Sequence, residues 1–125
     1  MSVATDLYTA LHAISNIDRV DDTKAPDGYL LTVGGYPAIV FSLISDVPDI
    51  PIGGAIAGYT QRWQVSVRSL DLAGARTAKA AVVAALHGLK STSIQWCQYE
   101  GPGPVLFEDG TPAEYHAPID FLLYA

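Results

Sequence analysis

The stretch from Tyr59 to Leu89 constrains the fold more than any other part of the sequence. From Tyr59 to Ser69 bulky residues alternate with polar ones, which is typical of a strand with one buried and one solvent-facing side. Asp71 follows as a candidate helix cap, and an alanine-rich segment with a broad apolar face runs from Leu72 to about Leu89. The small alanine side chains permit close approach of this helix to a sheet or to another subunit.

Further elements are predicted on either side of this unit. Apolar residues spaced three and four apart from Leu7 to Ile17 favour a helix, with Ser2 or Thr5 as its cap. Because the strands come in blocks and do not alternate strictly with helices, we expect an α+β fold: one domain spanning residues 1–125, with a mostly antiparallel sheet of four to five strands and two main helices packed on one face. The other expected strands are 29–33, 36–45, 93–99 and 113–124, with turn-rich loops at 18–28 and 100–112.

The alternation within these strands predicts which side chains are buried. The near-continuous apolar run at 36–45 indicates burial on both faces. Cys97 is expected to face away from Ile94 and Trp96. The last strand places Asp120 on one side and an apolar set on the other: Tyr115, Ala117, Ile119, Phe121 and Leu123.

A glycine-rich loop from Asp46 to Gly58 is apolar, although an exposed hairpin tip is normally polar. Its tip reads Gly-Gly-Ala-Ile-Ala-Gly. An apolar tip of this kind is typical of a segment that docks on another surface. The candidate docking residues are Gly53, Gly54, Ala55, Ile56, Ala57 and Gly58.

The composition indicates more apolar surface than one small core needs. Half of the 125 residues are apolar and 16% are charged, whereas about a quarter are charged in a typical soluble domain. A chain of this length forms a core without metals or disulfides. The surplus apolar surface therefore predicts a buried interface, as in an oligomer.

Charge is distributed unevenly along the chain. The net charge is −6, whereas a protein that grips DNA phosphates is normally basic. Five of the seven basic residues lie between Tyr59 and Lys90 with a single acid, and the rest of the chain holds twelve acids. Oppositely charged surfaces suit head-to-tail association, although such residues equally serve as solvated surface. The candidate interface residues are Arg62, Arg68, Arg76 and Lys79, facing acids of a neighbour such as Asp21 and Asp22.

No set of residues in the sequence indicates catalysis or a cofactor. The three histidines lack metal-ligand spacing among themselves or with Cys97, and no nucleophile elbow or phosphate-binding loop is present. Glu108 and Asp109 precede a glycine and are predicted to form a turn. We therefore expect no cofactor, no metal and no enzymatic activity. The single cysteine, the polar N-terminus and the lack of a long apolar run predict a protein made in the cytoplasm and not held in a membrane.

The layout of the chain resembles that of the tail terminator (tail completion) proteins of long-tailed bacteriophages. The resemblance covers nearly the whole chain, although no single motif in it is diagnostic. It follows an N-terminal helix, a strand with Gly-Tyr-Pro-Ala-Ile-Val-Phe at 35–41 and a long loop. It continues through Arg-Trp-Gln-Val-Ser-Val-Arg-Ser at 62–69, the alanine-rich helix, a strand with Trp96 and a closing strand with Tyr-His-Ala-Pro-Ile-Asp-Phe at 115–121.

The resemblance implies a structural virion protein without a cofactor. Such proteins form a ring, usually a homohexamer, which caps the tail tube, ends its polymerisation and provides the surface for head joining. The implied partners are other copies of the chain, the tail tube protein and the head-tail connector proteins, and DNA passes through the lumen without specific binding. The implied location is the head-proximal end of the virion tail, after assembly in the host cytoplasm.

Four other functions remain open on the sequence alone, one of which is an accessory or adaptor domain of a larger cellular complex. The chain could be another head-tail connector or neck ring protein, or a tail tube subunit, which would polymerise where a terminator stops at one ring. A small ligand-binding or enzymatic α+β domain would instead need a pocket with convergent polar groups.

Overall fold

A computed structural model describes residues 2–24, 31, 35–55, 58–101, 105–108 and 113–125. Two helices and six strands are formed by these residues. In chain order they are α1 (Val3–His12), β1 (Arg19–Asp22), β2 (Ala38–Asp49), β3 (Gly58–Ser69), α2 (Leu72–Leu86), β4 (Trp96–Tyr99), β5 (Leu106–Glu108) and β6 (Glu114–Tyr124).

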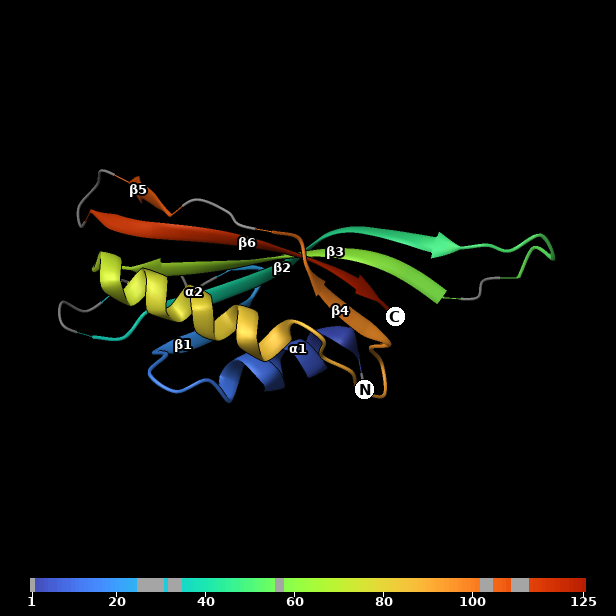
Figure 1. Ribbon diagram of the computed structural model, residues 1–125, viewed down its shortest axis with the longest axis horizontal. Coiled ribbons are helices and arrows are strands. Elements are labelled where there is room, and N and C mark those ends of the chain that lie inside the picture. Colours follow the sequence, from blue (N-terminus) through green and yellow to red (C-terminus); the bar gives the residue numbers. More distant parts are fainter. Residues whose placement is uncertain (1, 25–30, 32–34, 56–57, 102–104, 109–112) are drawn as a thin grey trace.

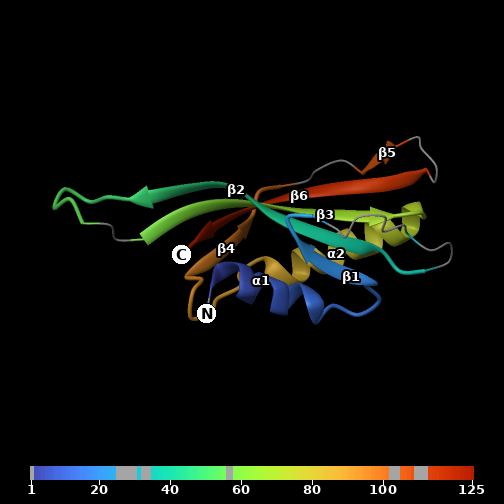
Figure 2. The ribbon, with the colours of Figure 1, turned by 180° about the vertical axis from the view of Figure 1, so that it is seen from behind.

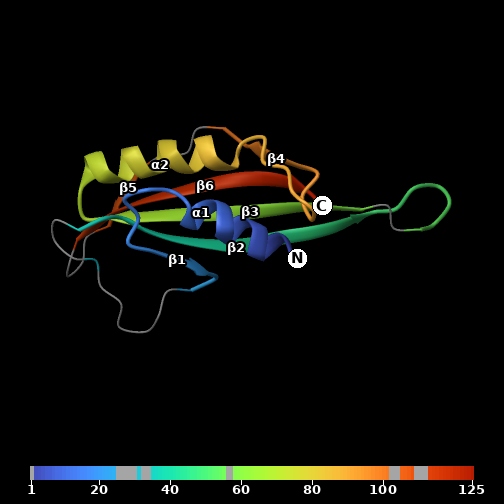
Figure 3. The same ribbon diagram turned by 90° about the horizontal axis from the view of Figure 1, so that it is seen from below.

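The strands form one sheet in the order β1-β2-β3-β6-β4, and β5 also pairs with β6. Every pairing is antiparallel except that of β1 with β2. Both helices lie on the same face of the sheet, as Figure 3 shows. The α+β fold predicted from the sequence is confirmed, with six strands among the described residues where four to five were expected.

The core lies between the helices and the sheet. The alternation predicted for β3 and β6 is confirmed, because Trp63, Val65 and Val67 are buried on one side and are joined there by four of the five apolar residues expected on β6. Tyr115 on β6 is only partly buried. The helices contribute Leu7, Leu11, Ala75, Ala78, Val82 and Leu86 to the buried core.

Both helices begin at predicted caps and end earlier than expected. The Ser2 hydroxyl accepts a hydrogen bond from the Thr5 N–H at 3.1 Å, and the Asp71 carboxylate accepts one from the Gly74 N–H at 3.0 Å. The first helix stops at His12, and the apolar residues after it pack against the core without being helical. Spacing alone therefore predicted burial there correctly and helix length incorrectly.

The segment predicted as an 18–28 loop contains a strand, β1. Its pairing with β2 is supported by the Asp18 N–H, which donates to the Pro37 carbonyl at 2.8 Å, and the Thr23 N–H, which donates to the Phe41 carbonyl at 2.7 Å. Val20 is its buried apolar residue. Its four mostly polar residues show no detectable alternation, so the sequence pattern does not reveal this strand. Its backbone is ordered by pairing with β2, which follows later in the chain.

Two further predictions in the second half of the chain need correction. Cys97 does face away from Trp96, since Cys97 is buried and Trp96 is exposed, but Ile94 is buried in the core together with Cys97. Ile94 precedes β4 in a turn where the Ser91 N–H donates to the Ile94 carbonyl at 2.9 Å. The alternation therefore starts afresh after that turn. β5 lies within the predicted 100–112 loop. Of the expected 29–33 strand only Leu31 is described, and it is buried outside any strand.

Candidate assembly surface

β2 runs on past β1, which pairs only with Ala38–Phe41, and the end of β2 and the start of β3 then extend past β6 as a two-stranded projection, visible in Figures 1 and 2. We call residues 43–55 and 58–60 the arm. At about 3.3 Å per residue, the β2 residues from Leu43 to Asp49 span about 20 Å. Ile44 is an extra residue in the ladder, because Leu43 pairs with Trp63 and Ser45 with Arg62. A bulge of this kind bends the strand and changes the direction of the residues after it.

The arm carries a concentration of exposed apolar side chains. Ile52 is fully exposed, and Val47 and Ile50 are 57% and 60% exposed. The expectation of burial on both faces at 36–45 is therefore wrong at Tyr36, which is exposed, and from Leu43 onward, since only the first half of β2 packs in the core. Exposed apolar surface of this kind is typical of interaction sites. The other exposed members are Leu43, Ile44 and Tyr59.

The predicted docking loop falls at the end of the arm. The described part of its tip is exposed: Gly53, Gly54 and Ala55. Ile56 and Ala57 lie outside the described residues, and Gly58 is the first residue of β3. Docking by this segment stays a prediction.

The arm is anchored where it leaves the body. The Tyr59 N–H donates to the Ala125 carbonyl at 3.0 Å, and the Ala125 N–H donates to the Tyr59 carbonyl at 2.8 Å. Glycine at position 58 permits this close approach, because a Cβ there would lie 2.8 Å from the same Ala125 oxygen. The arm therefore has a fixed direction at its base.

The outer edge of the arm is interrupted by a proline. Both backbone groups of Tyr59 point toward Ala125, so Pro48, its partner on β2, occupies a non-hydrogen-bonded pair. The ring nitrogen of Pro48 therefore lies on the outer edge, where it has no N–H to donate. A proline in this place prevents a further strand from pairing along the edge. Any contact of the arm with another surface would therefore rely on its side chains.

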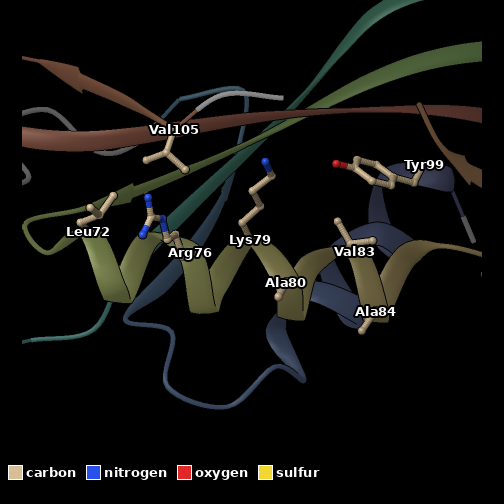
Figure 4. A pocket seen from close by; sticks show the side chains of 8 residues that line it. All are labelled: Leu72, Arg76, Lys79, Ala80, Val83, Ala84, Tyr99 and Val105. Atoms are coloured by element: carbon tan, nitrogen blue, oxygen red, sulfur yellow. The ribbon is translucent and has the colours of Figure 1, made fainter. Parts of the chain in front are cut away.

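A second surface lies along α2, on the side of the helix that faces Tyr99 of β4 and Val105. It is a groove of about 650 Å³ formed by α2, Tyr99 and Val105, which we call the α2 groove. Arg76 and Lys79 leave the same side of the helix, and Lys79 extends between Val105 and Tyr99 (Figure 4). The groove is thus an apolar surface with two basic side chains. The remaining lining residues are Leu72, Ala80, Val83 and Ala84.

The predicted interface residues fall into two groups in the structure. The α2 groove contains Arg76 and Lys79, whereas Arg68 and Arg62 lie on β3 and have acidic partners within the chain. Arg68 donates two hydrogen bonds to Glu114 at 2.8 and 3.1 Å, and Arg62 lies 3.8 Å from Glu100.

The predicted acidic partners, Asp21 and Asp22, both lie on β1. Asp21 accepts from the Arg19 guanidinium at 2.6 Å in the same chain. Asp22 is exposed and accepts from the Thr23 hydroxyl. The structure brings no predicted acid beside a predicted base, so contact between the two groups across subunits stays a prediction.

The described residues offer little to a chemical reaction. Burial raises the pKa of the Cys97 thiol to about 12, so this group is not a nucleophile at neutral pH. No three His, Cys, Asp or Glu side chains of the described residues gather as a metal site. His12 stacks on Tyr8, and His87 accepts from the Tyr99 N–H at 3.1 Å.

Within the described part of the chain, no helix has the length and apolar character to cross a membrane.

One structural site was missed because helical spacing placed Asp6 on the polar side of α1. Asp6 is buried and accepts hydrogen bonds from the hydroxyls of Ser91 and Ser93. These bonds hold the pKa of the Asp6 carboxyl below its usual range. The site joins α1 to the turn before β4. Its partners are distant in sequence, so no local pattern could reveal it.

The fold is shared with a protein chain in the solved structure described as "Virion of native gene transfer agent (GTA) particle". The two chains superpose with a TM-score of 0.65 at 19% sequence identity, over 98% of this chain and 93% of that chain. The likeness at this identity establishes a common fold. No family model and no curated protein matches the sequence.

Proposed function

We propose that this chain is a structural, non-enzymatic protein of a phage-like virion, and that it acts by assembling with copies of itself and with other virion proteins. The observation that carries the proposal is the arm. Its apolar side chains are exposed in the single chain although its base is anchored, and they would be buried only against another molecule. The likeness in fold to a chain of the gene transfer agent particle supports the same role.

We further infer that the chain is a tail terminator. In this role a ring, with six subunits as the expected number, caps the tail tube at its head-proximal end and stops its polymerisation. The ring then presents a surface to the head-tail connector proteins. The layout that resembles terminators over nearly the whole chain supports this assignment, as does a projection suited to contacting a neighbour or the tube.

The charge of the chain is compatible with DNA passing through such a ring. A net charge of −6 on each subunit gives an acidic assembly, and an acidic lumen repels phosphates where a basic one would bind them. DNA would therefore pass without specific binding.

The proposal is tested on tail tubes assembled with and without this chain. Electron microscopy of the tubes should show a single ring at one end when the chain is present, with a narrow distribution of tail lengths. Without the chain, the tubes should be longer and uneven in length. Two results would contradict the assignment: tail lengths that do not depend on the chain, or long tubes formed by the chain alone, which identify it as a tube subunit.

A further inference from the structure

Two surfaces of the molecule are complementary in chemistry. The arm offers aliphatic side chains with acids between them, and the α2 groove offers apolar side chains with two basic residues. We propose that the arm of one copy docks in the α2 groove of the next copy. This inference rests on the proposed function and specifies the contact that joins the subunits.

The contact has to be made between copies. The arm and the first turns of α2 lie at opposite ends of the molecule, and the arm points away from the groove (Figure 1). Paired backbone from Ser45 to Asp49 keeps the arm extended, so it cannot fold back on its own chain. Arm-to-groove docking is therefore head-to-tail, which is the geometry that closes into a ring or propagates as a filament.

The charges of the two surfaces are opposite. Asp46 and Asp49 flank Val47 on the arm, both are exposed, and residues 43–60 contain no basic residue. The residues that line the α2 groove include Arg76 and Lys79 and no acid. Attraction between these groups favours the arm over the other exposed apolar residues as the occupant of the groove, and it makes the contact sensitive to salt.

The size of the groove and the construction of the arm are compatible with such a contact. Pro48 makes the outer edge of the arm a poor site for strand addition, so docking relies on side chains. Ile50 and Ile52 are the most exposed aliphatic residues of the arm. A groove of about 650 Å³ is within the range of about 300–1,000 Å³ that accommodates small ligands or a few side chains.

Cross-linking between introduced cysteines tests the contact directly. Cys97 is buried with a raised pKa, so the native chain offers no reactive thiol. The test variant carries Ile52→Cys and Ala80→Cys, which puts one thiol on the arm tip and one in the groove. The matched control carries Ile52→Cys and Ala73→Cys, because Ala73 is an exposed alanine on another side of the same helix.

A short bismaleimide is applied to both variants, in concentrated solution and on tail tubes. The proposal predicts a ladder of covalent oligomers for the Ala80 variant in at least one of these settings and much less for the Ala73 variant. Equal cross-linking of both variants, no cross-linking in either setting, or dimers formed by Ile52→Cys alone would overturn the proposal.

Charge exchange supplies a second test on the same contact. Arg76→Glu and Asp49→Arg should each weaken association by about fivefold, and the double variant should recover most of it. Asp22→Arg is the control, since Asp22 is an exposed acid away from the arm. Each reversal of an acid is also combined with Arg76→Glu. If association is restored by adding Asp22→Arg and is not restored by adding Asp49→Arg, the neighbour's β1 occupies the groove and the proposal fails.

The two proposals fail in different ways. Rings that cap tubes without Ile52–Ala80 cross-links would overturn the contact and leave the terminator role standing. Cross-linked copies that form open filaments and never cap a tube would leave the contact standing and overturn the terminator role.

Discussion

The guanidinium of Arg68 donates two hydrogen bonds to the carboxylate of Glu114, from β3 to the start of β6 in one chain. The sequence alone suggested that Arg68 faces an acid of a neighbouring subunit. In the structure Arg68 instead pairs with Glu114 of the same chain. The side chain of Arg68 is 25% exposed and that of Glu114 is 15% exposed. Its first role is then to hold the two strands together.

Arg68→Glu should therefore destabilise the folded chain. Loss of the paired hydrogen bonds, with Glu114 left partly buried beside a like charge, should lower the free energy of unfolding by about 1–3 kcal/mol. Urea denaturation measures this change. The exchanged variant Arg68→Glu/Glu114→Arg should regain much of the loss and associate like the native chain. Altered association at unchanged stability would instead place Arg68 at a subunit contact.

Asp6 should make stability depend on pH in the acid range. The folded pKa of this carboxyl is lowered by the hydroxyls of Ser91 and Ser93. Its contribution is therefore fully present above its unfolded pKa of about 3.9 and is lost as pH falls through the folded pKa. The melting temperature of Asp6→Asn should lie below that of the native chain at pH 7, and the gap should narrow toward about pH 3. A gap that is constant with pH would contradict this linkage.

The two halves of β2 should respond differently to mutation. Phe41 is buried and packs on Trp63 with ring centroids 6.0 Å apart, so Phe41→Ala should cost about 3–5 kcal/mol. Val47 is exposed on the arm, so Val47→Ser should change stability by no more than about 0.5 kcal/mol while weakening assembly. Urea denaturation and light scattering separate the two effects. A large loss of stability in Val47→Ser would mean that the arm belongs to the core.

Two glycines of the arm provide a matched pair. A Cβ at Gly58 would lie 2.8 Å from the Ala125 carbonyl oxygen, whereas a Cβ at Gly53 meets nothing within 4 Å. Gly58→Ala should thus disturb the base of the arm at a cost of about 1–3 kcal/mol, and Gly53→Ala should be nearly neutral. Thermal denaturation compares them. Similar losses for both, or none for Gly58→Ala, would show that the base of the arm is not fixed by this contact.

The parts of the fold that local patterns govern were predictable, and those that depend on distant partners were not. The alternation of β3 and β6, the caps at Ser2 and Asp71 and the α+β class all result from spacing and side-chain chemistry. By contrast, β1 is a strand because its backbone forms hydrogen bonds with β2, which lies further along the chain. Leu43 and Val47 lie on the part of β2 that runs past its neighbour β1, which ends opposite Phe41; no apolar pattern in the sequence records where that neighbour ends.

The sequence located the candidate docking segment at 53–58, but it did not reveal the paired strands that form the arm or the exposed side chains along them. Glycine and apolar residues together marked residues 53–58 as a docking segment, yet the most exposed apolar side chains among the described residues of the arm precede it, at Val47, Ile50 and Ile52. Leu72 and Val83 belong to the segment predicted to carry a broad apolar face, and both line the α2 groove. A helix with apolar residues on a broad face leaves open which part of that face the sheet covers.

The mass of the purified chain in solution tests the central claim most directly. Light scattering across protein and salt concentrations, with tail tubes added in a second series, measures how many copies of the 13.3 kDa chain associate. We predict a discrete ring-sized species, six chains being the expected number, or a monomer that closes into a ring on tubes. A chain that stays monomeric in both series would contradict the ring assembly.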